Sequence, residues 1–383
     1  ISFGVIALLL SCGFIEWIFW AMRDATIHSR LGHIQIASSE FFAGSSANPS
    51  AFVLPQDAPE LALIASIPDV RMVTPRVSFS GLASRGEATI SFLGEGVNPE
   101  REEQVSRLLH IVRGQGLSSA DPKGIVIGQG LAALLGVTIG DPVILLVNTA
   151  SGGINAVEAH VRGFFYTVSK QFDDAALRIP LGLAQELLRI TGSHVWVVLL
   201  SDTARTQTVA QSLKHQLSTR RSSWQLKTWD ELAEFYNQTV ALYSRQMNVV
   251  KFIIGLIIVL SIANTMTMNV LERTGEIGTL MALGTKRRQI LRQFLVEGFT
   301  LGVVGGTFGT LVGVGLALAT SYVGIPMPPA PGMSTGFTGE ILVTPGLAAQ
   351  AFFLAILTSV AASVYPSWKA SKLKIVDALR HNK

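Results

Sequence analysis

Cysteine and charge are both scarce in this sequence. One cysteine, Cys12, stands among 383 residues, so no disulfide can form within the chain. Charged residues make up 15% of the chain and hydrophobic residues 49%, whereas a soluble domain carries about 25% charged residues. The mean hydropathy is +0.43. This balance argues against a soluble enzyme and indicates a membrane protein.

The motifs of nucleotide, metal and nucleic-acid chemistry are missing. The sequence has no Gly-Lys dipeptide and therefore no P-loop. It also lacks metal-ligand pairs such as H-E-x-x-H and basic runs interleaved with aromatic residues. Residues 332–336 match the pattern G-x-S-x-G, but no predicted strand precedes them and no helix follows, so we take the match as chance. We expect no catalytic residue, metal or cofactor in this chain and no nucleic-acid partner.

Four apolar stretches are long enough to cross about 30 Å of hydrocarbon, which takes roughly 20 residues. They lie at about 1–20, 249–271, 294–322 and 347–365. Lys and Arg are concentrated in residues 272–292 and after the fourth stretch, and none occurs in residues 323–345. By the positive-inside rule the two basic segments are cytoplasmic, and residues 23 to about 246 lie outside.

These spans divide the chain into eight predicted segments. The first residue is not Met and lies within an apolar run, so we also expect a cytoplasmic lead-in before it. The segments are transmembrane helix one (1–22), an outer domain (23–228), a stalk helix that continues into transmembrane helix two (229–271), a cytoplasmic loop (272–292), transmembrane helix three (293–322), an outer loop (323–346), transmembrane helix four (347–366) and a cytoplasmic tail (367–383).

The outer domain mixes strand and helix patterns. Runs rich in β-branched residues predict strands at 33–37, 71–79, 88–93, 143–147, 157–166 and 195–200. Apolar residues at helical spacing predict helices at 59–67, 100–111, 129–135, 181–190 and 203–217. The mixture argues for an α+β or α/β domain. A turn-rich stretch at about 95–160 is interpreted as an inserted subdomain.

A single helix is predicted to run from the outer domain into the second span. Thr228 and Glu231 fit a capping box at its start. Neither Pro nor Gly occurs from Thr228 until Gly255. Such a helix is either a rigid strut, which carries displacement between the membrane and the outer domain, or a simple linker; we favour the strut.

Small and acidic residues in the spans each have two alternative roles. Gly305, Gly309 and Gly313 are four residues apart, so they let another helix approach closely, either within the chain or in a dimer. Glu16 either faces a cavity on a transport pathway or reaches the interface by snorkelling. A receiving wall for an amphiphilic substrate, or else packing between spans one and two, is predicted at Phe14, Trp17, Met247 and Val250.

The loop after the second span carries the most specific pattern. Its apolar residues predict a short amphipathic helix that Gly284 ends. Such a helix, joined to two spans, suits docking into a groove of a soluble partner. The alternative is a helix that lies on lipid, with its basic end on anionic headgroups.

The same loop resembles the permease domain of the MacB/LolC/FtsX superfamily of ABC transporters. The superfamily pattern, E-R-x-x-E-I-G-x-L-x-A-x-G followed by a helix with an E-G pair, occurs here at Glu272, Arg273, Glu276, Ile277, Gly278, Leu280, Ala282, Gly284, Glu297 and Gly298. Residues 365–380 resemble the ending of that family. Residues 94–99, 128–132, 135–141 and 172–173 resemble its periplasmic domain, and residues 31–36 are most similar to lipoprotein-releasing permeases.

The resemblance implies a multi-pass protein of the bacterial inner membrane. Its fold class is an α-helical membrane protein with four transmembrane helices plus a large α/β periplasmic domain between helices one and two. Such permeases pair with a second copy or a paralogue, and two copies of a separate ABC ATPase bind ATP and Mg²⁺ for them. Motion then reaches the periplasmic domain by mechanotransmission. The residues expected to couple to the ATPase are Glu272, Arg273, Glu276, Ile277, Gly278, Leu280, Ala282, Leu283 and Gly284.

Three functions remain open. We favour extraction of an amphiphile, a lipoprotein or lipid, from the membrane lipids, because a lipid anchor prefers the bilayer by about 0.8 kcal/mol per buried CH₂. The alternatives are drug or peptide efflux like that of MacB, and signalling like that of FtsX, in which a periplasmic partner is activated. Residues 148–156 stand where one lipoprotein-releasing subunit has a long Pro-rich hook for a chaperone; they are few and lack Pro, which argues against that role.

Overall fold

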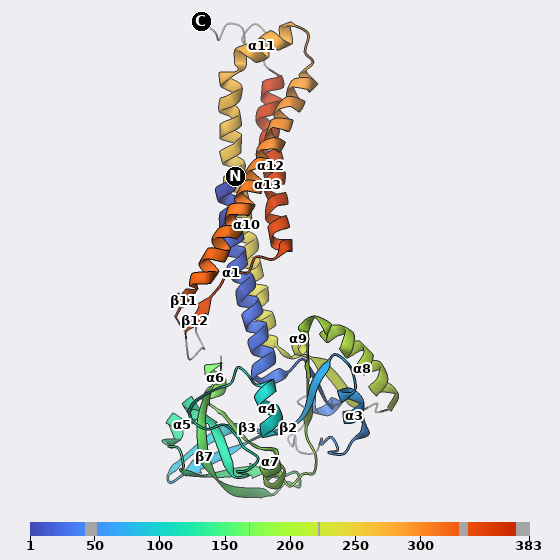
Figure 1. The fold of residues 1–383 in the computed structure, drawn as a ribbon, viewed down its shortest axis with the longest axis vertical. Helices are drawn as coiled ribbons and strands as arrows, with labels where there is room; N and C mark the ends of the chain where they lie inside the picture. The colour runs from blue at the N-terminus through green and yellow to red at the C-terminus, as the bar shows by residue number, and fades with distance from the viewer. Residues whose placement is uncertain (43–51, 168, 221–222, 329–335, 373–383) are drawn as a thin grey trace. The chain divides into compact units, whose positions relative to one another are not determined.

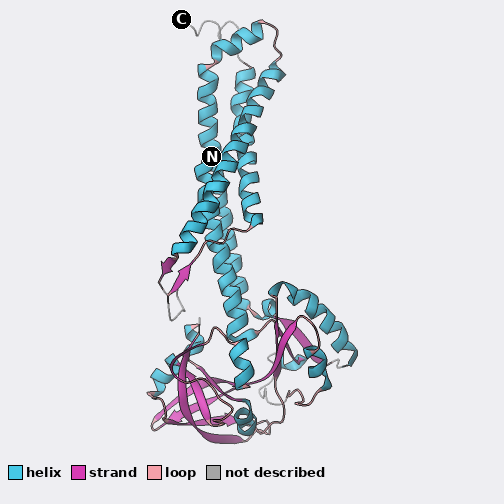
Figure 2. Cartoon of the chain, in the orientation of Figure 1, coloured by secondary structure: helices cyan, strands magenta, loops and turns pink. Residues whose placement is uncertain are grey.

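The computed structural model describes residues 1–42, 52–167, 169–220, 223–328 and 336–372. Figures 1 and 2 show its helices and strands. The chain forms two compact units. The helical unit comprises Ile1–Ala21, Gln238–Met327 and Thr338–Lys383, and the α/β unit comprises Met22–Asn237 and Pro328–Phe337. The basic tail from residue 373 onward and most of the G-x-S-x-G string lie outside the described residues.

Four long helices dominate the helical unit: α1 (Ser2–Thr26), α10 (Glu234–Glu272), α12 (Arg287–Val323) and α13 (Pro345–Ser371). Each contains one of the four predicted apolar stretches, and each is long and apolar enough to cross a membrane. The prediction of four candidate spans is therefore confirmed. A π-helical turn, η1 (Ile27–Leu31), prolongs α1. A two-stranded sheet, β11 (Ile325–Met327) with β12 (Phe337–Gly339), follows α12.

Helix α12 packs on α13 through a seam of small residues. A Cβ atom added at Gly302 would lie 3.0 Å from the Ile356 Cα atom, and one added at Gly298 would lie 2.6 Å from the Ser363 Cβ atom. The Ser359 hydroxyl donates a hydrogen bond of 2.6 Å to the Gly298 carbonyl. Small residues at four-residue spacing thus bring the two backbones close, which drives helix association where lipid supplies no hydrophobic force.

The predicted packing glycines lie on another face of α12, against α1. A Cβ atom at Gly309 would lie 2.9 Å from Val5 Cβ, and one at Gly313 would lie 2.8 Å from Leu9 Cδ1. Gly305 lies beside Ile1 in the same way. Of the two alternatives for these glycines, the structure has the contact within the chain.

Six strands of the α/β unit close into a ring around the largest hydrophobic cluster. The strands pair in the order β2, β3, β8, β5, β7, β6 and back to β2. Helices α5 (Gln129–Leu135) and α7 (Leu181–Leu188) contribute leucines to this cluster. The strands are β2 (Val70–Arg85), β3 (Ala88–Val97), β5 (Gly124–Gly128), β6 (Pro142–Asn148), β7 (Ile154–Tyr166) and β8 (Ala176–Pro180); β4 (His110–Gly114) extends the ring at β7.

The first half of β2 leaves the ring and joins the open part of the same ten-stranded sheet. That part has the order β10, β1, β9, β2, with β1 (Ile34–Ser38), β9 (Val195–Leu200) and β10 (Trp224–Thr228). Helices α3 (Pro59–Ala65) and α8 (Thr206–Arg220) pack on it through a second hydrophobic cluster. The residues of the ring cluster run from 77 to 190, a wider range than the 95–160 expected of an inserted subdomain. The remaining short helices are α2 (Ser39–Phe42), α4 (Pro99–Val105), α6 (Lys170–Asp173) and the 3₁₀ turn η3 (Thr203–Arg205).

The sequence patterns missed four strands of the ten-stranded sheet. Strands β5 and β8 are buried at every residue, so they lack the alternation that identifies a half-buried strand. Strand β4 is exposed at every residue. The helix predicted over 100–111 would have covered its first residues, but helix α4 ends at Val105. Strand β10 is five residues long and includes the polar Gln225 and Lys227.

The predicted stalk helix is interrupted at one residue. Helix α9 (Trp229–Leu232) ends at Ala233, whose φ and ψ of −87° and 61° are not helical. Glu231 accepts a hydrogen bond of 3.3 Å from the Thr228 N–H, the glutamate half of the predicted capping box. The side chain of Asn237 donates a hydrogen bond of 2.6 Å to the Asp230 carbonyl, which the break leaves without a helical partner. From Glu234 onward α10 is continuous for 39 residues.

The glycine seam predicts a sharp difference between two positions of α12. We expect Gly302→Val to destabilise the helical unit by about 1–3 kcal/mol, because the new side chain meets the α13 backbone and overpacks it. Gly315→Val is the matched control, since no atom lies within 4 Å of a Cβ added there. Thermal unfolding in detergent, followed by far-UV circular dichroism, measures both. Equal melting temperatures for the two variants would contradict the seam.

Candidate functional site

A cavity of about 260 Å³ lies within the helical unit, among α1, α10 and the start of α13. Helix α1 contributes Cys12, Ile15, Glu16 and Phe19, and α10 contributes Ser244, Met247, Asn248 and Lys251. Each set is spaced i, i+3, i+4 and i+7, which places its members on one helix face. Thr344, Gly346, Leu347 and Gln350 complete the lining. A carboxylate, an ammonium group and two side-chain amides therefore share one cavity between apolar helices.

The cavity contains two of the five residues predicted on the substrate path. Glu16 and Met247 line it. Phe14 instead packs beside Gly339 and stacks on Trp17, with ring centroids 6.4 Å apart. Val250 lies on α10, half-buried, outside the lining. Sequence reasoning missed Asn248, Lys251 and Gln350 as members of this site; the common i, i+3, i+4, i+7 spacing with Met247 was the signal available for the first two.

The predicted amphipathic helix is α11 (Thr274–Ala282), whose inner face packs within the helical unit. Ile277 and Gly278 are buried. Ile277 joins a cluster that holds the end of α10, the start of α12 and the end of α13 together, and Met281 packs against it from the side. The Thr274 hydroxyl donates a hydrogen bond of 2.8 Å to the Val270 carbonyl. These contacts tie α11 to three of the long helices.

The outer face of α11 is open to solvent. Leu280 is 40% exposed and Leu283 is 79% exposed, so the apolar residues predicted on one face divide between two. Gly284 ends the segment with a φ of +95°, a conformation that side chains with a Cβ rarely adopt. Arg273 and Glu276 form an exposed ion pair of 3.0 Å. The residues expected to couple to an ATPase are thus exposed, apart from Ile277 and Gly278; the exposed ones are Glu272, Arg273, Glu276, Leu280, Ala282, Leu283 and Gly284.

The α/β unit holds both of its helical connections in one hydrophobic cluster. Ile27 of η1, Trp229 of α9 and Ala233 are buried in it beside Val197 of β9. Tyr236, at the start of α10, packs against the cluster and places its ring 5.2 Å from that of Trp229. We call this cluster the junction. The chain segments that lead to α1 and α10 therefore contact the same strands.

A network of buried charged side chains also contacts η1. Arg178 pairs with Glu95 at 2.9 Å and with Glu102 at 3.3 Å, and Arg76 pairs with Glu102 at 2.7 Å. Burial alone would raise the pKa of Glu95, but the nearby guanidinium groups outweigh it and lower that pKa to about 2. All four side chains are almost fully buried.

The same guanidinium groups bind the carboxyl end of η1. Arg178 donates a hydrogen bond of 2.9 Å to the Ser29 carbonyl, and Arg76 donates to the Arg30 carbonyl. Carbonyl groups at the end of a helix lack partners within it and carry partial negative charge. Two buried cations therefore clamp the end of the first long helix to β2 and β8.

His33 provides a titratable contact next to the junction. Its Nδ1 accepts a hydrogen bond of 3.1 Å from the Leu200 N–H, and its Nε2 lies 3.0 Å from the Thr203 hydroxyl. Since Nδ1 is an acceptor, the ring is neutral in this arrangement. Burial lowers the pKa of His33 to about 4.

Two protein families match this chain over separate stretches. Residues 1–216 match the MacB-like periplasmic core domain. Residues 248–375 match the FtsX-like permease C-terminal region. The first stretch contains α1 and most of the α/β unit, and the second contains α11, α12, α13 and most of α10. In the described part of the chain, no group of three or more His, Cys, Asp or Glu side chains is placed to hold a metal ion.

Individual relatives divide between two named activities. The chain is 28% identical over 341 residues to the macrolide export ATP-binding/permease protein MacB of Brucella abortus, covering 86% of this chain and 49% of the relative. It is 26% identical over 350 residues to the lipoprotein-releasing system transmembrane protein LolC of Xylella fastidiosa, covering 84% and 80%. The chain thus spans about half the length of the MacB relative. The solved periplasmic region of MacB from Actinobacillus actinomycetemcomitans is similar with a TM-score of 0.41 and 15% identity, over 57% of this chain and 95% of that one.

The buried network predicts a large effect of one cation. We expect Arg178→Met to lower the stability of the α/β unit by about 3–5 kcal/mol, because it leaves Glu95 and Glu102 short of a buried partner. Lys170→Met is the control: Lys170 pairs with Asp174 at the surface, where such pairs contribute about 0–1 kcal/mol. Hydrogen–deuterium exchange of β3 and β8 in the purified chain measures the difference. Similar exchange in both variants would show that the network adds no stability.

His33 predicts a loss of stability in mild acid. Its folded pKa of about 4 lies below the unfolded value of 6.5, so the unfolded state takes up the proton first. Its contribution is complete above pH 6.5, falls progressively toward pH 4, and amounts to roughly 3 kcal/mol. Exchange rates of the β9 amides should therefore rise over that interval, and less steeply in His33→Gln. Glu95 acts in a lower window, because its stabilisation is lost between about 4.5 and about 2. A wild-type profile that is flat from pH 6.5 to 4 would contradict the neutral assignment.

Proposed function

The chain belongs to the family that joins a MacB-like periplasmic core domain to an FtsX-like permease region, and from this membership we propose that it is the transmembrane subunit of an inner-membrane ABC transporter that moves an amphiphilic substrate. In this proposal the α/β unit stands in the periplasm between transmembrane helices one and two. The chain itself hydrolyses no ATP. Two copies of a separate ABC ATPase hold ATP and Mg²⁺, and a second permease copy or a paralogue completes the transporter.

The outer face of α11 is the observation that carries this proposal. Exposed leucines on a short helix, followed by Lys286, Arg287 and Arg288, suit a groove on a soluble partner with an acidic rim. The inner face of α11 contacts three of the four long helices through its cluster. A force applied to α11 by the ATPase would therefore reach those helices together.

The junction and the charge network hold the two chain segments through which a force from α11 would enter the α/β unit. Helix α10 is continuous from Glu234 to Glu272, and its first turn packs against the junction through Tyr236. The end of η1 is clamped by Arg76 and Arg178. Both connections into the α/β unit are thus anchored on buried groups, which suits mechanotransmission: displacement of α1 and α10 would move this unit as one body.

The cavity beside Glu16 and Lys251 supports an amphiphilic substrate. Charged groups within membrane helices are costly and usually mark a functional pathway. Here both signs of charge and the amides of Asn248 and Gln350 would meet a polar headgroup, while Met247 and Phe19 would meet acyl chain. We assign the substrate path to this cavity, and Phe14, Trp17 and Val250 lie outside its lining. A lipoprotein or lipid is the preferred substrate.

The turn between β6 and β7, at residues 148–154, concerns the proposal that the substrate is a lipoprotein. Strand β6 ends at Asn148 and β7 begins at Ile154. The Thr149 N–H donates a hydrogen bond of 2.7 Å to the Gly153 carbonyl, which closes the turn. A hook for a chaperone needs a long projecting loop, so we propose that this subunit contributes none. If the transporter is Lol-like, a paralogue would carry that hook.

Efflux in the manner of MacB is the second candidate, favoured by the similarity of the Brucella abortus protein over 86% of this chain. Depletion of the protein in its native host separates the two. Lipoproteins retained in the inner membrane would support extraction. Normal lipoprotein sorting, together with co-purification of a periplasmic adaptor and an outer-membrane channel, would overturn it in favour of efflux.

The coupling assignment predicts the effect of two substitutions. Glu276→Lys reverses a charge on the outer face of α11, and Gly284→Val forces a β-branched residue into a φ of +95°. We expect each to lower substrate-stimulated ATP hydrolysis of the reconstituted complex at least about tenfold, which corresponds to about 1.4 kcal/mol. Co-purification of the ATPase should fall in parallel.

The control for these variants is Glu100→Lys, the same charge reversal at an exposed position of α4 in the other unit. It should leave hydrolysis unchanged. Circular dichroism and exchange of the α/β unit should be the same in all three variants. Wild-type stimulated hydrolysis in Glu276→Lys and Gly284→Val would show that α11 is not the coupling segment.

A further inference from the structure

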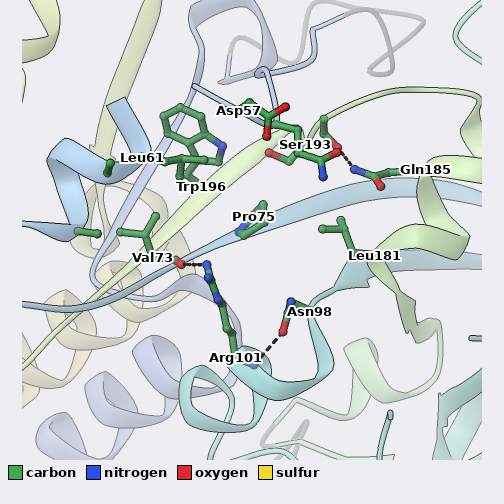
Figure 3. A pocket seen from close by; sticks show the side chains of 14 residues that line it. Asp57, Leu61, Val73, Pro75, Asn98, Arg101, Leu181, Gln185, Ser193 and Trp196 are labelled. Carbon is green, nitrogen blue, oxygen red and sulfur yellow. Dashed lines mark hydrogen bonds between the residues drawn. The ribbon is translucent and has the colours of Figure 1, made fainter. Parts of the chain in front are cut away.

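The α/β unit contains a second cavity, of about 460 Å³, which the proposed function leaves unassigned. It lies among α3, the first half of β2, the start of α4 and α7, and Figure 3 shows the side chains around it. Its volume is typical of pockets that bind small ligands. Residues from both hydrophobic clusters of the unit meet here, so the cavity is part of the fold rather than a surface irregularity.

Two polar atoms at the floor of the cavity have no partner in the part of the chain that the structure describes. They are Nε1 of Trp196 and Oγ of Ser193, and these side chains are 0% and 1% exposed. The indole nitrogen of Trp196 lies on the edge of the ring that faces Asp57 and Ser193 (Figure 3). A buried donor without a partner costs free energy that an acceptor would recover. The indole N–H only donates, so the ligand atom it meets must be an acceptor.

The mouth of the cavity carries one charge of each sign. Asp57 and Arg101 are both exposed at its rim. The Arg101 guanidinium is held by a hydrogen bond of 3.0 Å from Nη1 to the Val73 carbonyl, and among the described residues its other N–H groups have no acceptor. A ligand that offers both acceptors and donors therefore suits the rim better than one with net charge.

The walls between floor and mouth are apolar. Leu61, Val73, Pro75 and Leu181 form them, together with Ala62 and Ala65 of α3. A bare acyl chain would fit these walls but would leave the Trp196 and Ser193 atoms without partners. A phosphate group would satisfy those donors but would be opposed by Asp57. An extended peptide segment meets all three requirements, because each residue supplies a carbonyl acceptor, an N–H donor and a side chain.

We propose that this cavity binds an extended peptide segment with an apolar side chain. A peptide carbonyl oxygen accepts hydrogen bonds from Trp196 Nε1 and Ser193 Oγ. The apolar side chain packs against Leu61 and Leu181, and the flanking peptide groups meet Arg101 and Asp57. The proposal does not rest on transport: the site exists whether the subunit extracts, exports or signals.

Photo-crosslinking of the full-length chain in lipid nanodiscs tests the proposal. The probe is acetyl-photoleucyl-leucine amide, and mass spectrometry locates the adducts. We expect saturable labelling of the residues that line the cavity, displaced by unlabelled acetyl-leucyl-leucine amide. Ala62→Trp fills the cavity from an exposed position of α3 and should lower labelling at least tenfold. Ser193→Ala removes one donor and should weaken competition about three- to tenfold. Ala133→Trp, the same change at an exposed alanine of α5, should have no effect.

Three outcomes would overturn the proposal: labelling that does not saturate, equal labelling of Ala62→Trp and Ala133→Trp, or displacement by decanoate as effective as by the unlabelled peptide. Adding the reconstituted ATPase and ATP separates the sources of the segment. A cargo peptide stimulates hydrolysis, and a segment of an accessory protein does not; saturable labelling in the cavity supports the site in both cases. Failure of transport with intact labelling would count against the proposed function alone.

Discussion

Four buried side chains, Glu95, Glu102, Arg76 and Arg178, impose the constraint on which much of the α/β unit depends. A charge removed from water is strongly unfavourable unless it is paired and hydrogen-bonded. The four groups can satisfy one another only if β2, β3, β8 and α4 come together in one register. Arg76 Nη1 and Arg178 Nη2 also donate to carbonyl groups at the end of η1. The network therefore specifies where the first long helix enters the unit as well as how the strands meet.

The helical unit obeys a different constraint, because helices in lipid gain little from burying apolar side chains. Close approach through small residues replaces the hydrophobic effect as the source of packing. Helix α12 has two such faces, one of glycines against α13 and one against α1. Apolar side chains elsewhere on α10 and α12 remain exposed, as lipid-facing residues do. A polar cavity beside Glu16 within this unit is thus a costly feature, which is why it carries the substrate path in our proposal.

The α/β unit buries both of the chain segments that connect it to the long helices in one cluster. Ile27, Trp229 and Ala233 are buried together in the junction, so the two chain segments that leave the α/β unit share one anchor. The break at Ala233 adds a turn between α9 and α10, but Tyr236 restores contact immediately beyond it. A strut that is anchored at its base transmits displacement better than one that ends in a free loop. The mechanotransmission that we propose therefore does not require one uninterrupted helix.

Features that depend on neighbours in the sequence were predictable from it. The four spans follow from runs of apolar residues, α5 follows from helical spacing that the structure reproduces at 129–135, and strands such as β6 follow from runs that contain β-branched residues. The position of Leu280 on a short helix, with Leu283 directly after it, was predictable. Their separation from Ile277 was not, because only the packing of α10, α12 and α13 decides which face is covered. Strands β5 and β8 carry no alternation since both of their faces are buried.

The charge network, the Glu16 cavity and the Trp196 pocket join residues that lie far apart along the chain. Local pattern carries no information about such pairings, and only the tertiary structure brought those groups together.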